Sequence, residues 1–123
     1  MGSWALWNAG LAGLLGAAGV VLASVAAHRA TDPSLATAAM FLIVHGAAVL
    51  ALSALGGAAP ATGFLVAGSL MLAGVALFSG DVTMRVLGGA RLFPMAAPTG
   101  GTLLIVAWLV AGVCGIFSAL RAG

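Results

Sequence analysis

Four long apolar segments constrain the fold of this chain more than any other feature. They lie at about residues 4–27, 34–55, 61–86 and 101–120, and each is long enough to cross the roughly 30 Å of hydrocarbon in a bilayer as a helix. Only six side chains are charged, whereas about a quarter are charged in a soluble domain. The sequence therefore predicts an all-α integral membrane protein. We expect a four-transmembrane-helix bundle with short loops, in which residues 1–123 form a single transmembrane domain.

The connections between the segments carry a few structural signals. Asp32 can cap a helix and Pro33 fits a first helical turn, so the two together mark the start of the second span. The last connection, residues 88–100, is mostly apolar but contains Pro94 and Pro98, which interrupt helices. We expect it to form an interfacial or shallow re-entrant loop against the bundle.

Small residues recur at helical spacing in the first and last segments. Lipid provides no hydrophobic drive for helix association, so helices associate where small side chains let their backbones approach closely. The pattern predicts a tightly packed bundle, and it also fits self-association through one face. The residues concerned are Ala9, Gly13 and Ala17, then Ala107, Ala111, Gly115 and Ala119.

The arginines give a weak indication of orientation. Arg29, Arg85 and Arg91 lie on the connections after the first and third segments, whereas Arg121 lies on the side of the amino terminus. Since cytoplasmic connections carry an excess of Lys and Arg, we expect both termini outside the cytoplasm.

Two histidines are candidate ligand-binding residues. His45 lies about 11 residues into the second segment, roughly 16 Å from its start, and so close to the bilayer midplane. It is either a neutral imidazole hydrogen-bonded across a helix interface, or a haem or metal ligand or proton-relay group. His28 ends the first segment, where it can cap carbonyls or reach headgroups. Their depths differ by more than about 12 Å, so we do not expect a shared haem, and a single-histidine haem remains an alternative.

Asp81 and Arg85 are the remaining ionisable residues within the spans. They are four residues apart with the acid first, which is the favourable order for an ion pair on a helix. We interpret them as a structural ion pair. The functional alternative is a gate or substrate contact whose pairing opens during a cycle.

Several functional classes lack the residues they require. The chain has no glutamate for proton coupling of the kind used by small multidrug exporters, and its one cysteine, Cys114, cannot form a redox pair. Zinc catalysis needs about three protein ligands, which two distant histidines do not supply. The scattered arginines form no footprint for nucleic acid. We therefore expect no enzyme activity, no metal site, no cofactor and no nucleic-acid partner.

A series of short motifs occurs in order along most of the chain, over about residues 10–120. The motifs are Ala26-Ala27-His28, Thr37-Ala38-Ala39, His45-Gly46-Ala47, Leu77-Phe78-Ser79-Gly80-Asp81, Pro94, Pro98-Thr99-Gly100-Gly101 and Trp108. In this order and spacing they resemble those of the domain-of-unknown-function 423 family. The resemblance implies a small four-helix protein of bacterial inner membranes, similar to the transmembrane-protein-256-like proteins of animals, and it implies no activity.

Together these features predict a small non-enzymatic inner-membrane protein that acts by binding. It would be an accessory or assembly subunit, or would hold a lipid or hydrophobic ligand. The alternative is a small transporter or channel that uses His45, Asp81 and Arg85, and a third is a haem- or quinone-associated electron-transfer protein. Expected partners are membrane lipids and either further copies of the chain or a larger membrane complex.

Overall fold

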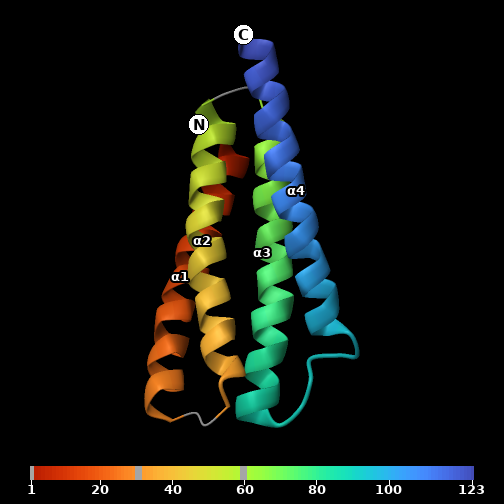
Figure 1. Ribbon diagram of the computed structural model, residues 1–123. Helices are drawn as coiled ribbons and strands as arrows, with labels where there is room; N and C mark the ends of the chain where they lie inside the picture. Colours follow the sequence, from red (N-terminus) through yellow and green to blue (C-terminus); the bar gives the residue numbers. More distant parts are fainter. Residues whose placement is uncertain (1, 30–31, 59–60) are drawn as a thin grey trace.

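The computed structural model describes residues 2–29, 32–58 and 61–123, which form a bundle of long helices (Figure 1). Four of these helices are long and apolar enough to span a membrane, and the described residues contain no strand. The predicted four-helix membrane bundle is therefore confirmed. The elements are α1 (Ser3–His28), α2 (Ser34–Ala58), α3 (Thr62–Thr83), η1 (Met84–Gly88) and α4 (Ala96–Ala122).

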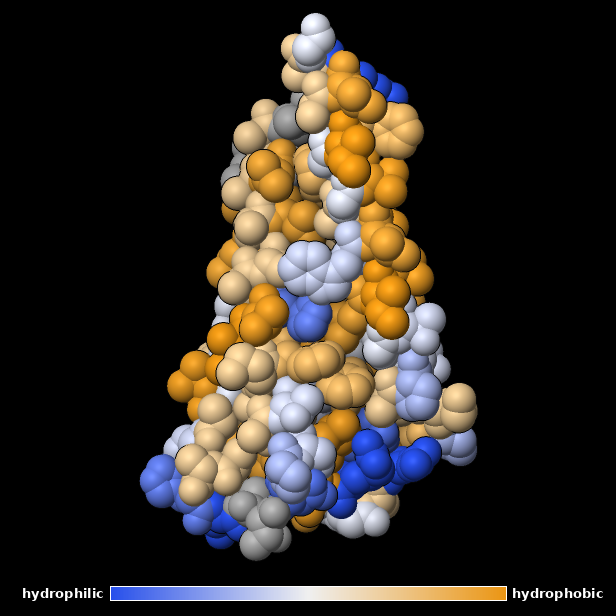
Figure 2. All heavy atoms as spheres, in the orientation of Figure 1, coloured by the Kyte–Doolittle hydropathy of each residue, from blue (hydrophilic) through white to orange (hydrophobic). Residues whose placement is uncertain are grey.

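Helices that are neighbours in sequence are also neighbours in the bundle. α1 packs on α2, α2 on α3 and α3 on α4, and α1 also touches α3. α3 is therefore the central element, and it contributes Met71, Val75 and Phe64 to the core. Both termini lie at one end of the bundle (Figure 1). Apolar side chains cover the flank seen in Figure 2, and hydrophilic ones gather at the opposite end from the termini.

Glycines set the closest helix contacts. A Cβ on Gly100 would lie 2.5 Å from the backbone nitrogen of Phe78 and 2.6 Å from the carbonyl oxygen of Gly74, so only glycine fits where α4 crosses α3. A Cβ on Gly19 of α1 would similarly lie 2.9 Å from the Cβ of Leu42 on α2. The helices therefore pack closely through small residues, although Gly19 and Gly100 are not among the residues of the predicted stripes.

The stripe of small residues in α1 does not face the interior of the bundle, so the prediction that it packs there is wrong, whereas self-association through it stays a prediction. Gly13 and Ala17 are exposed, and the buried face lies one residue further back along the helix, on Ala5, Asn8, Ala12, Gly19 and Leu22. The physical reason is Asn8, whose amide bonds to α3 and turns that face of the helix inward. In α4 the predicted stripe is buried only at Ala107.

Three predicted helix ends are also corrected. α2 continues past residue 55 to Ala58, and the third span ends in the π-helical turn η1 followed by Gly89 in the left-handed region (φ 73°). α4 begins at Ala96 instead of residue 101. Pro98 is tolerated there because the first-turn N–H groups have no acceptor within the helix. The predicted loop 88–100 therefore shrinks to residues 89–95.

The helix-start signal before α2 is confirmed. The Asp32 Oδ1 atom accepts hydrogen bonds from the backbone N–H of Ser34 at 2.9 Å and from its hydroxyl at 2.7 Å. These two bonds hold the pKa of the Asp32 carboxyl below its usual value. They also fix the entry of the chain into α2.

The last helix is displaced along the bundle axis relative to its neighbours. Gly63, near the start of α3, faces Cys114 of α4, and α4 continues to Ala122. Those eight further residues extend about 12 Å beyond the start of α3, as Figure 1 shows at the C-terminal end.

Candidate functional site

Asp81 is the structural centre of the hydrophilic end of the bundle. Its side chain is 1% exposed, whereas that of Arg85 is 41% exposed, and its Oδ2 atom lies 3.3 Å from the Nε of Arg85. Its Oδ1 atom accepts the backbone N–H of Leu92 at 2.9 Å. The carboxylate therefore forms the predicted ion pair and also anchors the connection 89–95 to α3, a role that the sequence did not indicate.

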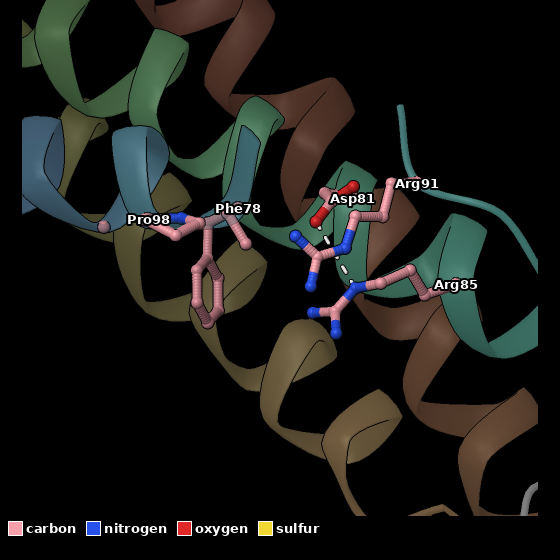
Figure 3. Close-up of a pocket in the computed structure, with 7 residues that line it drawn as sticks. Phe78, Asp81, Arg85, Arg91 and Pro98 are labelled. Atoms are coloured by element: carbon pink, nitrogen blue, oxygen red, sulfur yellow. Dashed lines mark ion pairs between the residues drawn. The ribbon is translucent and has the colours of Figure 1, made fainter. Parts of the chain in front are cut away.

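A pocket of about 420 Å³ opens beside this carboxylate, between α3 and the start of α4. Figure 3 shows Arg85 and Arg91 directing their guanidinium groups toward Asp81 from two different elements, with Phe78 and Pro98 on the other side of the pocket. We call this the arginine pocket. Its lining residues are Phe78, Asp81, Arg85, Arg91, Ala97, Pro98 and Gly101.

A second hollow, also of about 420 Å³, lies on the side of α3 that faces α1. We call it the apolar groove. The hydroxyl of Ser79 donates to the carbonyl of Ala38 at 2.8 Å, and that of Thr83 donates to the carbonyl of Ser79 at 2.6 Å. Its lining residues are Leu15, Ala18, Leu22, Leu42, Ala76, Ser79, Gly80, Thr83, Met84 and Leu92.

His45 is buried and hydrogen-bonded at both ring nitrogens. Its Nδ1 atom lies 2.8 Å from the carbonyl oxygen of Phe41, and its Nε2 atom lies 3.1 Å from the indole nitrogen of Trp108. A carbonyl can only accept and an indole N–H can only donate, so we assign a neutral imidazole with its proton on Nδ1. A haem iron at Nε2 would have to displace Trp108.

His28 lies apart from His45, at the exposed end of α1. Its Nδ1 atom is 2.9 Å from the carbonyl oxygen of Ser24, so the ring caps its own helix. Within the described ranges, no three His, Cys, Asp or Glu side chains are close enough to hold a metal ion.

The candidate residues do not converge on one site. Asp81 and Arg85 share the arginine pocket, and His45 lines neither that pocket nor the apolar groove. His45 and the arginine pocket are linked indirectly, through Phe41. Phe41, which accepts the His45 hydrogen bond, stacks on Phe78 of the arginine pocket with ring centroids 4.6 Å apart.

Sequence reasoning missed a polar network at the end near the termini. The Asn8 amide donates to the carbonyl of Leu65 at 3.1 Å and accepts the hydroxyl of Ser69 at 3.1 Å, and Ser69 accepts the indole N–H of Trp4 at 3.0 Å. The available signal was a lone asparagine inside an apolar segment, because such a side chain needs a partner in the bilayer. In the sequence Arg91 indicates only orientation, whereas the structure places it in the arginine pocket.

Comparisons with known proteins identify the family. No solved structure matches the chain. The model of the family described as "Protein of unknown function (DUF423)" matches residues 15–101, a range that includes both histidines and the Asp81–Arg85 pair. The resemblance drawn from the sequence motifs is thereby confirmed, and this multi-pass membrane protein belongs to the DUF423 family.

Proposed function

We propose that this chain is a small non-enzymatic protein of a bacterial inner membrane, which holds a lipid or another hydrophobic ligand in the apolar groove. The observation that carries the proposal is the lining of that groove. Eight of its ten residues are apolar, and the hydroxyls of Ser79 and Thr83 are already donating to carbonyls. A ligand there would be held by shape and dispersion, with no group free to react with it.

The absence of enzyme activity and of a cofactor is part of this proposal. General acid–base chemistry needs a side chain that can exchange a proton with a substrate. His45 has both nitrogens engaged within the bundle, and Asp81 has both oxygens engaged. These contacts support structural roles for the two side chains.

We also propose that both termini lie outside the cytoplasm. Arg29, Arg85 and Arg91 follow α1 and α3 at one end of the bundle, and Arg121 lies at the other end with the termini. The excess of arginine supports a cytoplasmic position for the first of these ends. Accessibility of single cysteines placed at the two ends of a Cys114→Ala chain would test it.

Filling the groove tests the binding proposal. Ala76 is an exposed residue of the groove, and Ala73, one turn earlier on α3, is exposed outside it. The protein extracted in mild detergent should carry a bound lipid or hydrophobic molecule in native mass spectrometry. We expect Ala76→Phe to lose it and Ala73→Phe to keep it. Retention in both variants, or a native protein that carries nothing, would contradict the proposal.

The exposure of α4 favours a second candidate, an accessory subunit of a larger membrane complex. Of its 27 residues only Ala96, Ala97, Gly100, Leu104 and Ala107 are buried, and a Cβ on Gly112 would meet nothing within 4 Å. A partner on this face should be lost in Gly112→Trp. It should be kept in Gly10→Trp, an equally open position on α1. The same native mass spectra distinguish the two outcomes.

A further inference from the structure

We propose that the arginine pocket binds a phosphate-bearing anion, the headgroup of an anionic phospholipid, between Arg85 and Arg91. The pocket is separate from the apolar groove, so the proposal does not depend on a ligand in that groove. Two guanidinium groups and one carboxylate line it, so the lining residues have one excess positive charge. The carboxylate of Asp32, which also interacts with Arg85, is not part of this lining. The carboxylate of Asp81 is occupied by Arg85 and by the N–H of Leu92.

Hydrogen-bond donors remain free at this charge. The ion pair uses only the Nε of Arg85. Across the part of the chain that the structure describes, no ion pair or hydrogen bond engages the Nη atoms of Arg85 or the guanidinium of Arg91. Figure 3 shows both groups directed into the same space. The planar fork of a guanidinium matches two oxygens of one phosphate, and two arginines can share one such group.

The start of α4 adds to the positive potential. Ala97 and Pro98, both in the first turn of this 27-residue helix, line the pocket. Met95 at its N-cap makes no side-chain hydrogen bond to the helix. The aligned peptide dipoles therefore place partial positive charge at the pocket, which favours an anion.

The position and the walls of the pocket favour a lipid over a free phosphate. It lies at the hydrophilic end of the bundle (Figure 2), which is the end of the spans that we expect to meet the headgroups. Phe78, Ala97 and Gly101 give it an apolar wall. A phospholipid would gain from both the arginines and that wall, whereas inorganic phosphate would gain only from the arginines.

The test uses the full chain in detergent micelles, titrated in native mass spectrometry with two lipids of identical acyl chains. We expect dioleoyl-phosphatidylglycerol to bind more tightly than dioleoyl-phosphatidylcholine. Arg91→Gln should weaken phosphatidylglycerol binding about tenfold, because it removes a charge-assisted contact. Arg91 is exposed on the connection, so the variant should fold. Arg121→Gln makes the same charge change at the other end and should have no effect.

Equal phosphatidylglycerol binding by Arg91→Gln and the native chain would overturn the proposal, as would an equal loss in Arg121→Gln. Inorganic phosphate, compared with sodium chloride at matched ionic strength, distinguishes the source of the anion. We expect it to leave phosphatidylglycerol bound. If inorganic phosphate displaces phosphatidylglycerol, and this displacement depends on Arg91, the pocket is a site for soluble phosphate and the lipid assignment is overturned. Ala76→Phe, which fills the apolar groove, should not alter the preference for phosphatidylglycerol over phosphatidylcholine. A failure of the groove proposal is therefore distinguishable from a failure of this one.

Discussion

The contact between α3 and α4 at Gly100 gives the sharpest prediction of stability. In Gly100→Ala the new Cβ would lie 2.5 Å from the backbone nitrogen of Phe78, about 1 Å inside an ordinary contact distance of about 3.5 Å. Because the opposing atoms belong to the backbone, the helices themselves must separate. A gap of about 0.5–1 Å already forfeits a quarter to a half of the dispersion energy of the atoms concerned. We expect a loss of about 1–3 kcal/mol in the free energy of unfolding, as in overpacked cores.

The neighbouring glycine provides the control. A Cβ on Gly101 would meet nothing within 4 Å, so Gly101→Ala should leave packing unchanged. It should even stabilise the helix by up to about 1 kcal/mol, because alanine loses less backbone entropy than glycine. The two variants differ by one position and have the same composition. Their effects should nevertheless have opposite signs.

Reversible unfolding in mixed micelles, followed by far-ultraviolet circular dichroism as the fraction of denaturing detergent rises, measures both variants. A Gly100→Ala protein as stable as the native chain would refute the reasoning. Equal destabilisation by both substitutions would also refute it, because the effect would then come from loss of glycine itself and not from the helix crossing.

Three further outcomes follow from single contacts. Trp108→Phe leaves the Nε2 atom of His45 without its donor, so unfolding measured in the same micelles should be easier by about 0.6–1.7 kcal/mol, and unchanged stability would exclude that bond. Asp81→Asn retains an oxygen for the N–H of Leu92 and loses only a half-exposed ion pair, at a cost of about 0–1 kcal/mol. Asp81→Leu removes both contacts and should cost about 1–3 kcal/mol of unfolding free energy. Equal losses of stability in Asp81→Asn and Asp81→Leu would disprove the anchoring role. Because the pKa of Asp32 is lowered in the folded protein, the ionised carboxylate stabilises the fold at pH values above its ordinary pKa of 3.8. This contribution is lost as the pH falls through the folded pKa. Asp32→Ala should therefore remove part of the acid sensitivity of unfolding, and identical pH profiles would contradict this assignment.

The spans were predictable because bilayer thickness imposes a length and an apolar composition that a sequence displays directly. The pairing of Asp81 with Arg85 was predictable for a similar reason, since both lie on one helix at a fixed spacing. Contacts within a single segment therefore follow from the sequence with little help from tertiary structure.

Contacts between helices did not follow in the same way. A sequence gives the small residues of α1 but not the rotation that buries them, which depends on Asn8 finding Leu65 on another helix. The bond from Trp108 to His45 joins residues 63 positions apart. The arginine pocket likewise depends on the π turn η1 and on the bond from Leu92 to Asp81. Pro94 signals that the connection interrupts the helix, but the sequence does not signal the π turn or that bond.

The axial displacement of α4 has a consequence for the surrounding membrane. The helix extends about 12 Å past the start of α3, and the extending segment is mostly apolar, including Ile116, Phe117 and Leu120. A bilayer of uniform thickness cannot match both sides of such a bundle. The leaflet next to α4 must thicken, or the whole protein must tilt, at a cost of fractions of a kcal/mol per Å. The chain should therefore partition toward thicker regions of a membrane.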